Sequence, residues 1–543
     1  MTDRETWKHA AEQVPLVNPR QRQVLDLIVA GHTNQEIADR LDITLSGAKW
    51  HVSELLSLFG FFSREELAEF WAAKGSRRRF GLLSPLLQTR WMAPLFATLV
   101  CLAIAVPWLL LRTSVSETPP AVATTDEAES LLPPSLSVLS EQLPLPAKGP
   151  GGILAYLNAH GDLIAKPMPT GSATVIRHSN GLRTPKWSPS GDYLAVVEQG
   201  TLIVLNDKGT VTTLAEVDND REWGWSPTQD LLAIFTADGM RLFDAPSGTT
   251  RVIRGQGSPL PEHAGAVIWS PDGTALLYQL SWSVGSPGRE QTSELRIFDL
   301  PTGQDRLLVS EKTPPLGGTS PAGWSGDGRW VYFREAPTFS ASGWVDGVPL
   351  MAMPANGGEK LNVGIMLAVD GLFVTGPGES AAFIDGGGRF AGESEKQLKV
   401  VNGATIGPTP GGDSDRWAAE AAWAPNGQEL VVVEASAPTQ PAAGGDAALA
   451  AYMGRKLWLR GPRGAKQLTS DSDFRDEHPL WASDGKTILF VRINEEGSAS
   501  IWTLSPGSGQ LSEMVDDLNT GARGVFGTYG WMEWNNLMDW WQP

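Results

Sequence analysis

The 543-residue sequence predicts a multidomain chain with an N-terminal all-α helix-turn-helix, a single transmembrane helix and a C-terminal all-β propeller. Three observations lead to this prediction. Short, clearly capped helix patterns fill residues 18–74, an uncharged apolar run covers residues 91–111, and a tryptophan–turn–strand unit recurs within residues 150–543. Eight blades are favoured for the propeller, and seven are the alternative.

The helix signals begin after an N-terminal arm, residues 1–17. A first helix is expected to begin at Pro19, because proline suits the first helical position, and to end at Gly31. Thr33 and Glu36 then form a capping box, in which each side chain accepts a hydrogen bond from the other residue's backbone N–H. This box predicts the start of a second helix.

Two more helices are expected further along the same segment. Thr44 caps the third helix, Gly60 ends it, and a second capping box at Ser63–Glu66 opens the fourth. Four short helices with a tight turn between the second and third match the helix-turn-helix plan, which places one helix in the DNA major groove.

The segment also resembles the LuxR-type helix-turn-helix family over about 55 residues. The matching residues are Pro19, Arg20, Arg22, Val24, Leu25, Gly31, Asn34, Glu36, Ile37, Ala38, Leu41, Ile43, Lys49, His51, Val52, Gly60 and Arg64. The resemblance implies DNA binding, usually as a dimer, with residues 45–58 as the recognition helix. A protein-interaction module, or a domain related to sigma-factor region 4, is the alternative.

The resemblance assigns base-edge or phosphate contacts to one face of the recognition helix and backbone contacts to helix N-termini, whose N–H groups suit phosphate oxygens. The candidate DNA-binding residues are Thr33, Asn34, Gln35, Thr44, Ser46, Lys49, Trp50, His51, Ser53 and Arg64. The sequence departs from the family pattern at Gln21, Gly47, Ala48 and Leu58. Leu58 replaces a common basic residue, which predicts fewer phosphate contacts and weaker affinity.

The run WMAPLFATLVCLAIAVPWLLL at residues 91–111 predicts a transmembrane helix. At ~1.5 Å per residue it reaches about 31 Å, the thickness of a bilayer's hydrocarbon core. A basic juxtamembrane segment, residues 75–90, precedes the run, and only Arg112 closely follows it. The positive-inside rule therefore predicts a single-pass cell-membrane protein with a cytoplasmic N-terminus and an extracytoplasmic propeller. A buried core helix is the alternative.

Charge divides the chain in the same way. Residues 1–90 carry a net charge of +1 and residues 113–543 a net charge of −20, out of −18 for the whole chain. A strongly acidic outer part argues against nucleic acid as its ligand. Cys101, the only cysteine, lies in the predicted span, so no disulfide stabilises the outer part. Residues 112–149 are rich in proline and predict an extended linker.

Residues 150–543 are dominated by one repeated unit: an apolar strand ending in Trp, a turn rich in Ser, Pro, Asp and Gly, and a second apolar strand. The six clear copies begin at Trp187, Trp225, Trp269, Trp324, Trp423 and Trp481. Residues 372–384 are a degenerate seventh copy without Trp. The pattern resembles TolB-type and WD-type β-propellers, and the first more closely because of its WSPDG turn.

The two ends of this region predict how the propeller closes. Residues 153–179 look like the later strands of a repeat without its first strand. Residues 527–541 look like a first strand, with Trp534 at the motif position. Joining them completes one blade, which brings the total to eight.

The sequence contains no nucleophile elbow, HExxH, cysteine cluster or EF-hand loop, so we expect neither an enzyme nor a bound metal or cofactor. The acidic cluster Asp471, Asp473, Asp476, Glu477 and His478 is expected to be a solvated loop before a strand rather than a metal site. Trp540 and Trp541 are expected to pack in the closing blade rather than to stack on sugars.

These features together predict a membrane-anchored one-component transcriptional regulator. Its cytoplasmic helix-turn-helix would bind promoter DNA, its propeller would sense an unknown ligand or envelope partner, and a homodimer would couple the two. The alternative is an envelope scaffold whose helix-turn-helix module binds a cytoplasmic protein. A propeller with enzymatic activity is a third alternative.

Overall fold

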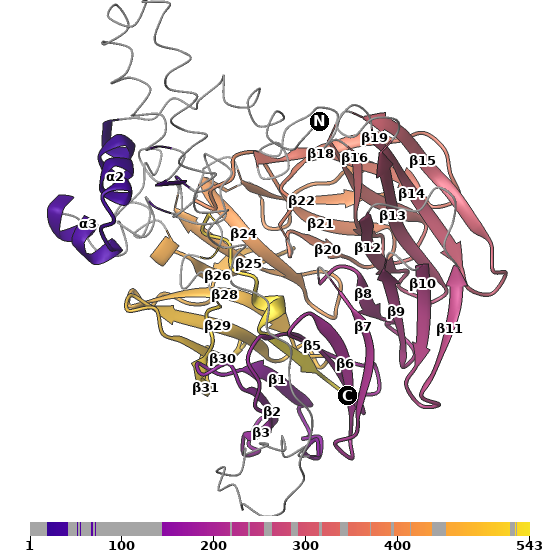
Figure 1. Cartoon of the computed structure of the whole chain (residues 1–543), viewed down its shortest axis with the longest axis horizontal. Helices are drawn as coiled ribbons and strands as arrows, with labels where there is room; N and C mark the ends of the chain where they lie inside the picture. The colour runs from indigo at the N-terminus through magenta and orange to yellow at the C-terminus, as the bar shows by residue number, and fades with distance from the viewer. Residues whose placement is uncertain are drawn as a thin grey trace, which may run out of the picture. The chain divides into compact units, whose positions relative to one another are not determined.

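A computed structural model describes residues 19–41, the single positions 52, 55, 67, 68 and 71, and residues 144–543 with gaps. The gaps are residues 218–219, 237–238, 255–262, 284–290, 314–317, 337–345, 370, 393–395, 413, 437–451, 522–526 and 528. The chain divides into two compact units, residues 1–138 with 444–446 and residues 139–443 with 447–543 (Figure 1).

The N-terminal unit contains α2 (Pro19–Val29) and α3 (Asn34–Leu41), which confirm the first two predicted helices. Gly31 adopts φ +80° after α2, a left-handed conformation that glycine accepts without strain, and its N–H bonds the carbonyl of Ile28. One buried apolar cluster joins the two helices to helical residues beyond them: Val24, Leu25, Ile28, Ile37, Val52, Leu55 and Leu67. The inner faces therefore pack as a helix-turn-helix core requires.

Within the described part of the chain, no helix is both long and apolar enough to cross a membrane. The predicted span, residues 91–111, lies outside the described residues. So do the N-terminal arm, the juxtamembrane segment 75–90, and residues 112–143 of the linker.

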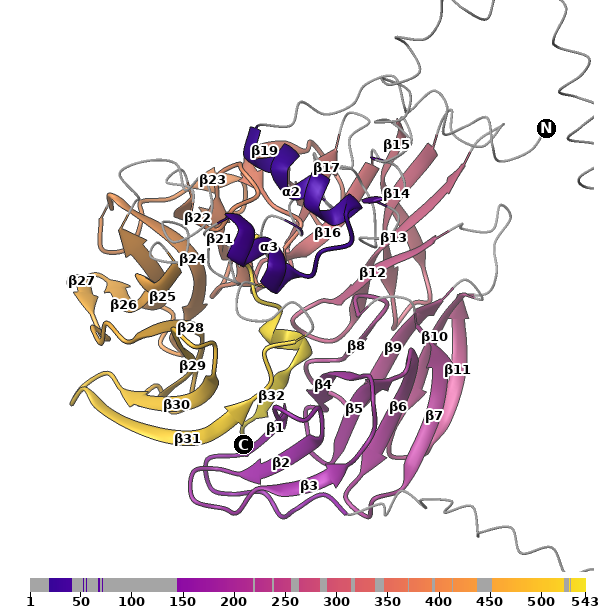
Figure 2. The same cartoon turned by 60° about the vertical axis from the view of Figure 1, so that its left-hand side comes forward.

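The C-terminal unit is a β-propeller of eight four-stranded antiparallel sheets, here called blades 1 to 8 (Figure 2). In chain order, the strands of the first four blades are as follows. Blade 1 contains β32 (Met538–Trp541), β1 (Ile153–Leu157), β2 (Leu163–Pro167) and β3 (Thr174–Arg177). Blade 2 contains β4 (Leu182–Trp187), β5 (Tyr193–Glu198), β6 (Thr201–Asn206) and β7 (Val211–Glu216). Blade 3 contains β8 (Trp223–Trp225), β9 (Leu231–Thr236), β10 (Gly239–Asp244) and β11 (Thr249–Arg254). Blade 4 contains β12 (His263–Trp269), β13 (Ala275–Ser283), β14 (Gln291–Asp299) and β15 (Asp305–Thr313).

The other four blades follow the same plan. Blade 5 contains β16 (Gly318–Trp324), β17 (Trp330–Ala336), β18 (Val348–Pro354) and β19 (Leu361–Met366). Blade 6 contains β20 (Phe373–Thr375), β21 (Ser380–Asp385), β22 (Gln397–Asn402) and β23 (Thr405–Ile406). Blade 7 contains β24 (Arg416–Trp423), β25 (Leu430–Ser436), β26 (Lys456–Gly461) and β27 (Gly464–Gln467). Blade 8 contains β28 (Phe474–Trp481), β29 (Ile488–Asn494), β30 (Ala499–Ser505) and β31 (Gln510–Leu518).

The second strand of each blade carries most of the core. In β5, β9 and β21 the four central residues are all buried, because both faces of the strand pack against neighbouring blades. This explains why these strands read as continuous apolar runs rather than alternating ones. The outermost strands are more polar: every residue of β27 is exposed.

Hydrogen bonds from the motif tryptophans connect neighbouring blades. The indole Nε1 of Trp225 donates to the Lys186 carbonyl at 3.0 Å, and that of Trp269 donates to the Gly224 carbonyl at 2.8 Å. Trp324 repeats the contact on the next blade, donating to the Ile268 carbonyl at 3.3 Å. In each case the acceptor directly precedes the motif Trp of the preceding blade.

The closing blade is built from both ends of this region, as predicted, which gives eight blades and not seven. β32 pairs antiparallel with β1, with Ile153 opposite Trp541 and Leu154 opposite Trp540 (Figure 2). The degenerate copy at residues 372–384 contributes β20 and β21 to a blade of its own. Trp540 and Trp541 pack against the apolar cluster of the closing blade, as expected.

The motif position in this blade was wrongly predicted. Trp534 lies in the short 3₁₀ helix η2 (Trp534–Asn536), before the strand. Trp541 lies at the end of the strand, where the six clear copies have their motif Trp. The reason is that Trp534 has another partner: its buried indole donates to Glu477 Oε2 at 2.9 Å.

Candidate functional site

The predicted capping box between Thr33 and Glu36 is formed. The Thr33 N–H donates to Glu36 Oε2 at 2.8 Å, and the Glu36 N–H donates to Thr33 Oγ1 at 3.3 Å. The hydrogen bond from the Thr33 backbone N–H is the main reason that the pKa of Glu36 lies below its ordinary value. The candidate phosphate contact at Thr33 is therefore also the N-cap of α3, and its side chain stays exposed.

The remaining candidate DNA-binding residues fall into two groups. Asn34 and Gln35 lie in the first turn of α3, where backbone N–H groups lack intrahelical partners. The others lie outside the described residues: Thr44, Ser46, Lys49, Trp50, His51, Ser53 and Arg64. Val52 and Leu55, between and beside them in the chain, are buried in the apolar cluster.

The members of the predicted acidic cluster differ in their exposure to solvent. Asp471 and Asp473 are exposed, as expected of a solvated loop, but Asp476 and Glu477 are fully buried in β28, which corrects the prediction. Burial is tolerated because arginines neutralise both carboxylates. Among the described residues, no group of three or more His, Cys, Asp or Glu could hold a metal ion.

Glu477 is the centre of this buried network. Its Oε1 accepts a short hydrogen bond from Arg455 Nη1 and lies 3.1 Å from Arg475 Nε. Its Oε2 accepts the Trp534 indole. The Arg455 Nη2 group also donates to the Gly530 carbonyl at 2.6 Å. One carboxylate thus joins blade 8 to the segment that leads into the closing strand.

Two titratable groups beside this network have displaced pKa values. Burial, followed by the charge of Glu477, raises the pKa of Glu420 to about 8. Burial, followed by the charge of Lys186, lowers the pKa of His478 to about 3. The His478 backbone N–H, at φ +54°, donates to Glu420 Oε2 at 2.8 Å. At neutral pH we therefore expect a mostly protonated Glu420 beside a neutral His478.

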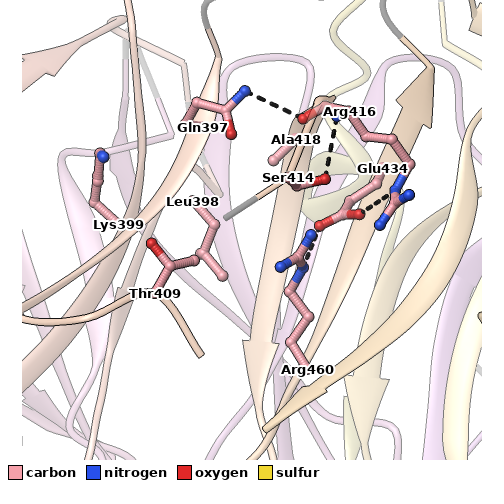
Figure 3. Close-up of a pocket in the computed structure, with 9 residues that line it drawn as sticks. All are labelled: Gln397, Leu398, Lys399, Thr409, Ser414, Arg416, Ala418, Glu434 and Arg460. Carbon is pink, nitrogen blue, oxygen red and sulfur yellow. Dashed lines mark hydrogen bonds and ion pairs between the residues drawn. The ribbon is translucent and has the colours of Figure 1, made fainter. Parts of the chain in front are cut away.

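A small polar pocket lies between blades 6 and 7 (Figure 3). It has a volume of about 20 Å³ and is lined by Gln397, Leu398, Lys399, Thr409, Ser414, Arg416, Ala418, Glu434 and Arg460. The Glu434 carboxylate lies between two guanidinium groups: Arg416 Nε donates to Oε2 at 2.8 Å, and Arg460 Nε donates to Oε1 in a short hydrogen bond. Both Glu434 and Arg460 are almost completely buried.

Residues 17–71 match the family described as bacterial regulatory proteins, luxR family. The chain therefore carries a LuxR-type helix-turn-helix domain, with limits close to the predicted 18–74. The match includes the capping box and the apolar cluster described above, and it suggests DNA binding. It covers only this N-terminal segment of the chain.

No curated protein matches the chain. Solved structures that resemble the propeller include a prolyl endopeptidase, at 14% identity over 69% of this chain and 49% of that chain, with a TM-score of 0.40. A protein assigned as TolB from Agrobacterium tumefaciens is 15% identical over 68% of this chain and 90% of that chain, with a TM-score of 0.27. The β-propeller domain of the Trilobed protease from Pyrococcus furiosus is 11% identical over 68% of this chain and 96% of that chain, with a TM-score of 0.36. This chain spans about half the length of the prolyl endopeptidase.

The LuxR-type domain was predicted from its residues, whereas the buried charges of the propeller were not. A signal was present: Glu434 follows the apolar run LVVV and Arg460 follows the apolar run LWL. A charge inside such a strand implies a buried partner, because isolated charges are rarely buried. The sequence could not show that these two residues are each other's partners, since they lie 26 positions apart.

Proposed function

We propose that the chain is a membrane-anchored one-component transcriptional regulator. Residues 17–71 bind promoter DNA in the cytoplasm, residues 91–111 cross the membrane once, and the propeller senses a ligand or envelope partner on the outside. The observation that supports this proposal most is the LuxR-type domain on the same chain as a propeller, with 21 uncharged residues between them.

The family match supports the DNA interface that we propose, whose residues are those predicted from the sequence. Lys49, Trp50 and Ser53 take the base-edge or nearby phosphate contacts, and the N-terminus of α3 lies against the DNA backbone. Helix N-termini suit phosphate oxygens because their N–H groups and dipole attract anions. Thr33 supports this contact indirectly, since its capping box fixes the first turn of α3.

The experiment is genome-wide crosslinking and recovery of DNA with the full-length protein. We expect discrete peaks that disappear in the Lys49→Ala, Trp50→Ala double variant and persist in Lys208→Ala, a control at an exposed propeller residue. Absence of peaks above background for the well-expressed wild type would contradict the proposal.

The membrane topology has a separate test. Alkaline phosphatase, which folds only outside the cytoplasm, should be active when fused after residue 543 and inactive when fused after residue 80. Equal activity at both positions would contradict a single span at residues 91–111. Crosslinking of the full-length protein in membranes tests the proposed homodimer, because a dimer gives a discrete band at twice the monomer mass.

The second candidate is an envelope scaffold whose helix-turn-helix module binds a cytoplasmic protein. Leu58, in place of a common basic residue, favours it because fewer cations weaken phosphate contacts. Binding of the full-length protein to promoter fragments at increasing salt separates the candidates. DNA binding weakens steeply with salt through counterion release, whereas a scaffold shows no such binding.

We further propose that the propeller binds rather than catalyses, a view supported by the lack of a catalytic motif in its sequence. Turnover assays with peptide, ester and oligosaccharide substrates test this. A saturable rate that copurifies with the full-length protein would contradict it.

A further inference from the structure

The pocket between blades 6 and 7 contains more positive than negative charge. Lys399, Arg416 and Arg460 line it, and Glu434 supplies the single carboxylate of the lining. The exposed Asp415 carboxylate, outside the lining, lies 3.9 Å from Arg416 Nη1. This local excess is unusual in an outer region whose net charge is −20. Buried charges are stable only when they are paired, so an excess of cations around a partly buried pocket favours an added anion.

The hydrogen bonds show which donors remain for such an anion. Arg460 uses Nε on Glu434 and Nη1 on the Gly412 carbonyl at 2.8 Å. Its Nη2 is buried and makes no hydrogen bond within the described part of the chain, although the side chain is only 1% exposed. A buried guanidinium nitrogen without an acceptor costs free energy, and a carboxylate oxygen would supply that acceptor.

The walls of the pocket are held in place. The Arg416 guanidinium stacks over the Trp458 ring at 3.7 Å, which fixes its plane while Nε holds Glu434. The Ser414 hydroxyl accepts the Arg416 backbone N–H at 3.1 Å and keeps its own hydrogen for donation. Figure 3 shows Lys399 and Gln397 on one side of the view and Arg416, Glu434 and Arg460 on the other.

We propose that this pocket binds the carboxylate group of a small anionic ligand. Its volume of about 20 Å³ is enough for one water molecule, and so for one carboxylate oxygen at depth with the rest of the group toward the mouth. A planar carboxylate suits the edge of a guanidinium, and the Thr409 and Ser414 hydroxyls can donate to its second oxygen.

The location gives binding a structural consequence. Lys399 belongs to β22 of blade 6, Arg416 and Glu434 to blade 7, and Thr409 to the segment that links the two blades. A carboxylate bound here contacts both blades and their connection at once, and so stiffens that junction. If the propeller is a sensor, as proposed above, this pocket is its ligand site, but the binding itself does not depend on DNA recognition.

The experiment titrates sodium acetate into the full-length protein by calorimetry at constant ionic strength. Acetamide, which has the same shape without the charge, is the matched probe. We expect saturable one-site binding of acetate and none of acetamide. No saturable heat with acetate, or equal binding of both probes, would overturn the proposal, and this comparison requires no variant.

Variants then locate the site. Arg460→Gln would remove a buried ion-pair partner of Glu434 and so destabilise blade 7. We therefore choose Lys399→Gln and Thr409→Val instead. We expect Lys399→Gln to weaken acetate binding about tenfold and Thr409→Val about fivefold, as for loss of one charged or one neutral contact. Lys312→Gln, at an exposed position of β15, is the control with the same charge change. Equal weakening in Lys312→Gln would show a general charge effect and overturn the assignment.

The result is separable from the proposed function. Acetate binding without DNA peaks would support the carboxylate site and contradict the proposed regulator. DNA peaks without acetate binding would support the regulator and overturn the carboxylate site.

Discussion

Gly191 shows how a single turn residue serves both its own hairpin and the closure of the propeller. Its φ of +72° is left-handed, and a Cβ there would lie 2.5 Å from Cδ2 of Trp541. Gly248 has a similar φ of +67° but open space around it. We expect Gly248→Ala to cost about 1 kcal/mol, for the backbone alone, and Gly191→Ala about 2–4 kcal/mol, because Trp541 must also move. Denaturant unfolding of the two variants measures the difference, and equal losses would contradict the contact.

Glu477 is the second residue whose role can be isolated. Replacing it with Gln leaves Arg455 and Arg475 buried without their shared carboxylate. We expect Glu477→Gln to lower the free energy of unfolding by about 3–5 kcal/mol, the range for breaking a buried ion pair from one side. Glu495→Gln, the same change at an exposed position, should shift it by less than about 0.5 kcal/mol. A loss in Glu477→Gln as small as that of the control would show that the network does not stabilise blade 8.

The displaced pKa values of Glu420 and His478 make stability depend on pH in opposite senses. For His478, the unfolded chain takes up a proton below the ordinary pKa of 6.5 and the folded chain does so only near 3, so stability falls as pH drops through this window. For Glu420, the folded chain keeps a proton up to about pH 8 that the unfolded chain releases near 4.5, so stability falls as pH rises through that window.

We therefore expect the wild type to lose stability between pH 6.5 and 8, and Glu420→Gln to lose less. Gln retains an oxygen that can accept the His478 N–H but cannot titrate. Denaturant unfolding of both proteins across this range measures the difference, with Glu495→Gln as the control. Parallel curves for the wild type and Glu420→Gln would show that Glu420 does not titrate in this window.

Elements were predicted well where their signal is local. Thr33 and Glu36 predicted the start of α3. In the six clear copies, the Trp and the polar turn after it predicted the hairpin between the first two strands of a blade. Trp534 was misplaced because four tryptophans lie close together near the C-terminus, at positions 531, 534, 540 and 541, and local sequence cannot choose among them. The position of each tryptophan is decided by its partner in the fold. Trp534 donates to Glu477, and Trp541 lies opposite Ile153, the first residue of β1.

The capping box gives a prediction for an element as a whole. In Thr33→Ala the Glu36 N–H loses its acceptor, so the first turn of α3 should open more readily. We expect the free energy of opening α3 to fall by about 1 kcal/mol, which is about a fivefold faster hydrogen exchange at the Ile37 amide. Arg22→Ala, at an exposed position of α2, is the control and should leave that amide unchanged. Unchanged exchange in Thr33→Ala would mean that the cap does not limit opening.

At the scale of the whole molecule, the repeats were enough to predict a propeller and to favour eight blades. The turn motif marks six blades, the degenerate copy indicates a seventh, and the two ends of the region indicate the eighth. The charged networks could not be predicted, because their members lie far apart in the sequence: Glu434 and Arg460 are 26 positions apart, and Arg455 and Glu477 are 22 positions apart. Glu434 and Arg460 lie on neighbouring strands of one sheet. Arg455, which directly precedes β26 of blade 7, contacts Glu477 of the neighbouring blade 8. Such pairings depend on register and on blade packing, which a single sequence does not contain.

Closure by β32 is the feature on which the propeller as a whole depends. Met538 is fully buried, and β32 supplies the only partner for one edge of β1 within the described blade. Deleting residues 538–543 would expose that edge and the apolar cluster beneath it. It would also remove the hydrogen bond from the Trp541 indole to the Pro189 carbonyl of blade 2 and the one from Gln542 to the Trp481 carbonyl of blade 8. We expect the deletion to lower the unfolding midpoint strongly and to make the protein aggregate through the open edge. A chain lacking only the exposed Pro543 should behave as the wild type. A truncated chain with a wild-type midpoint would mean that seven complete blades suffice, and that the pairing of the two chain ends adds little stability.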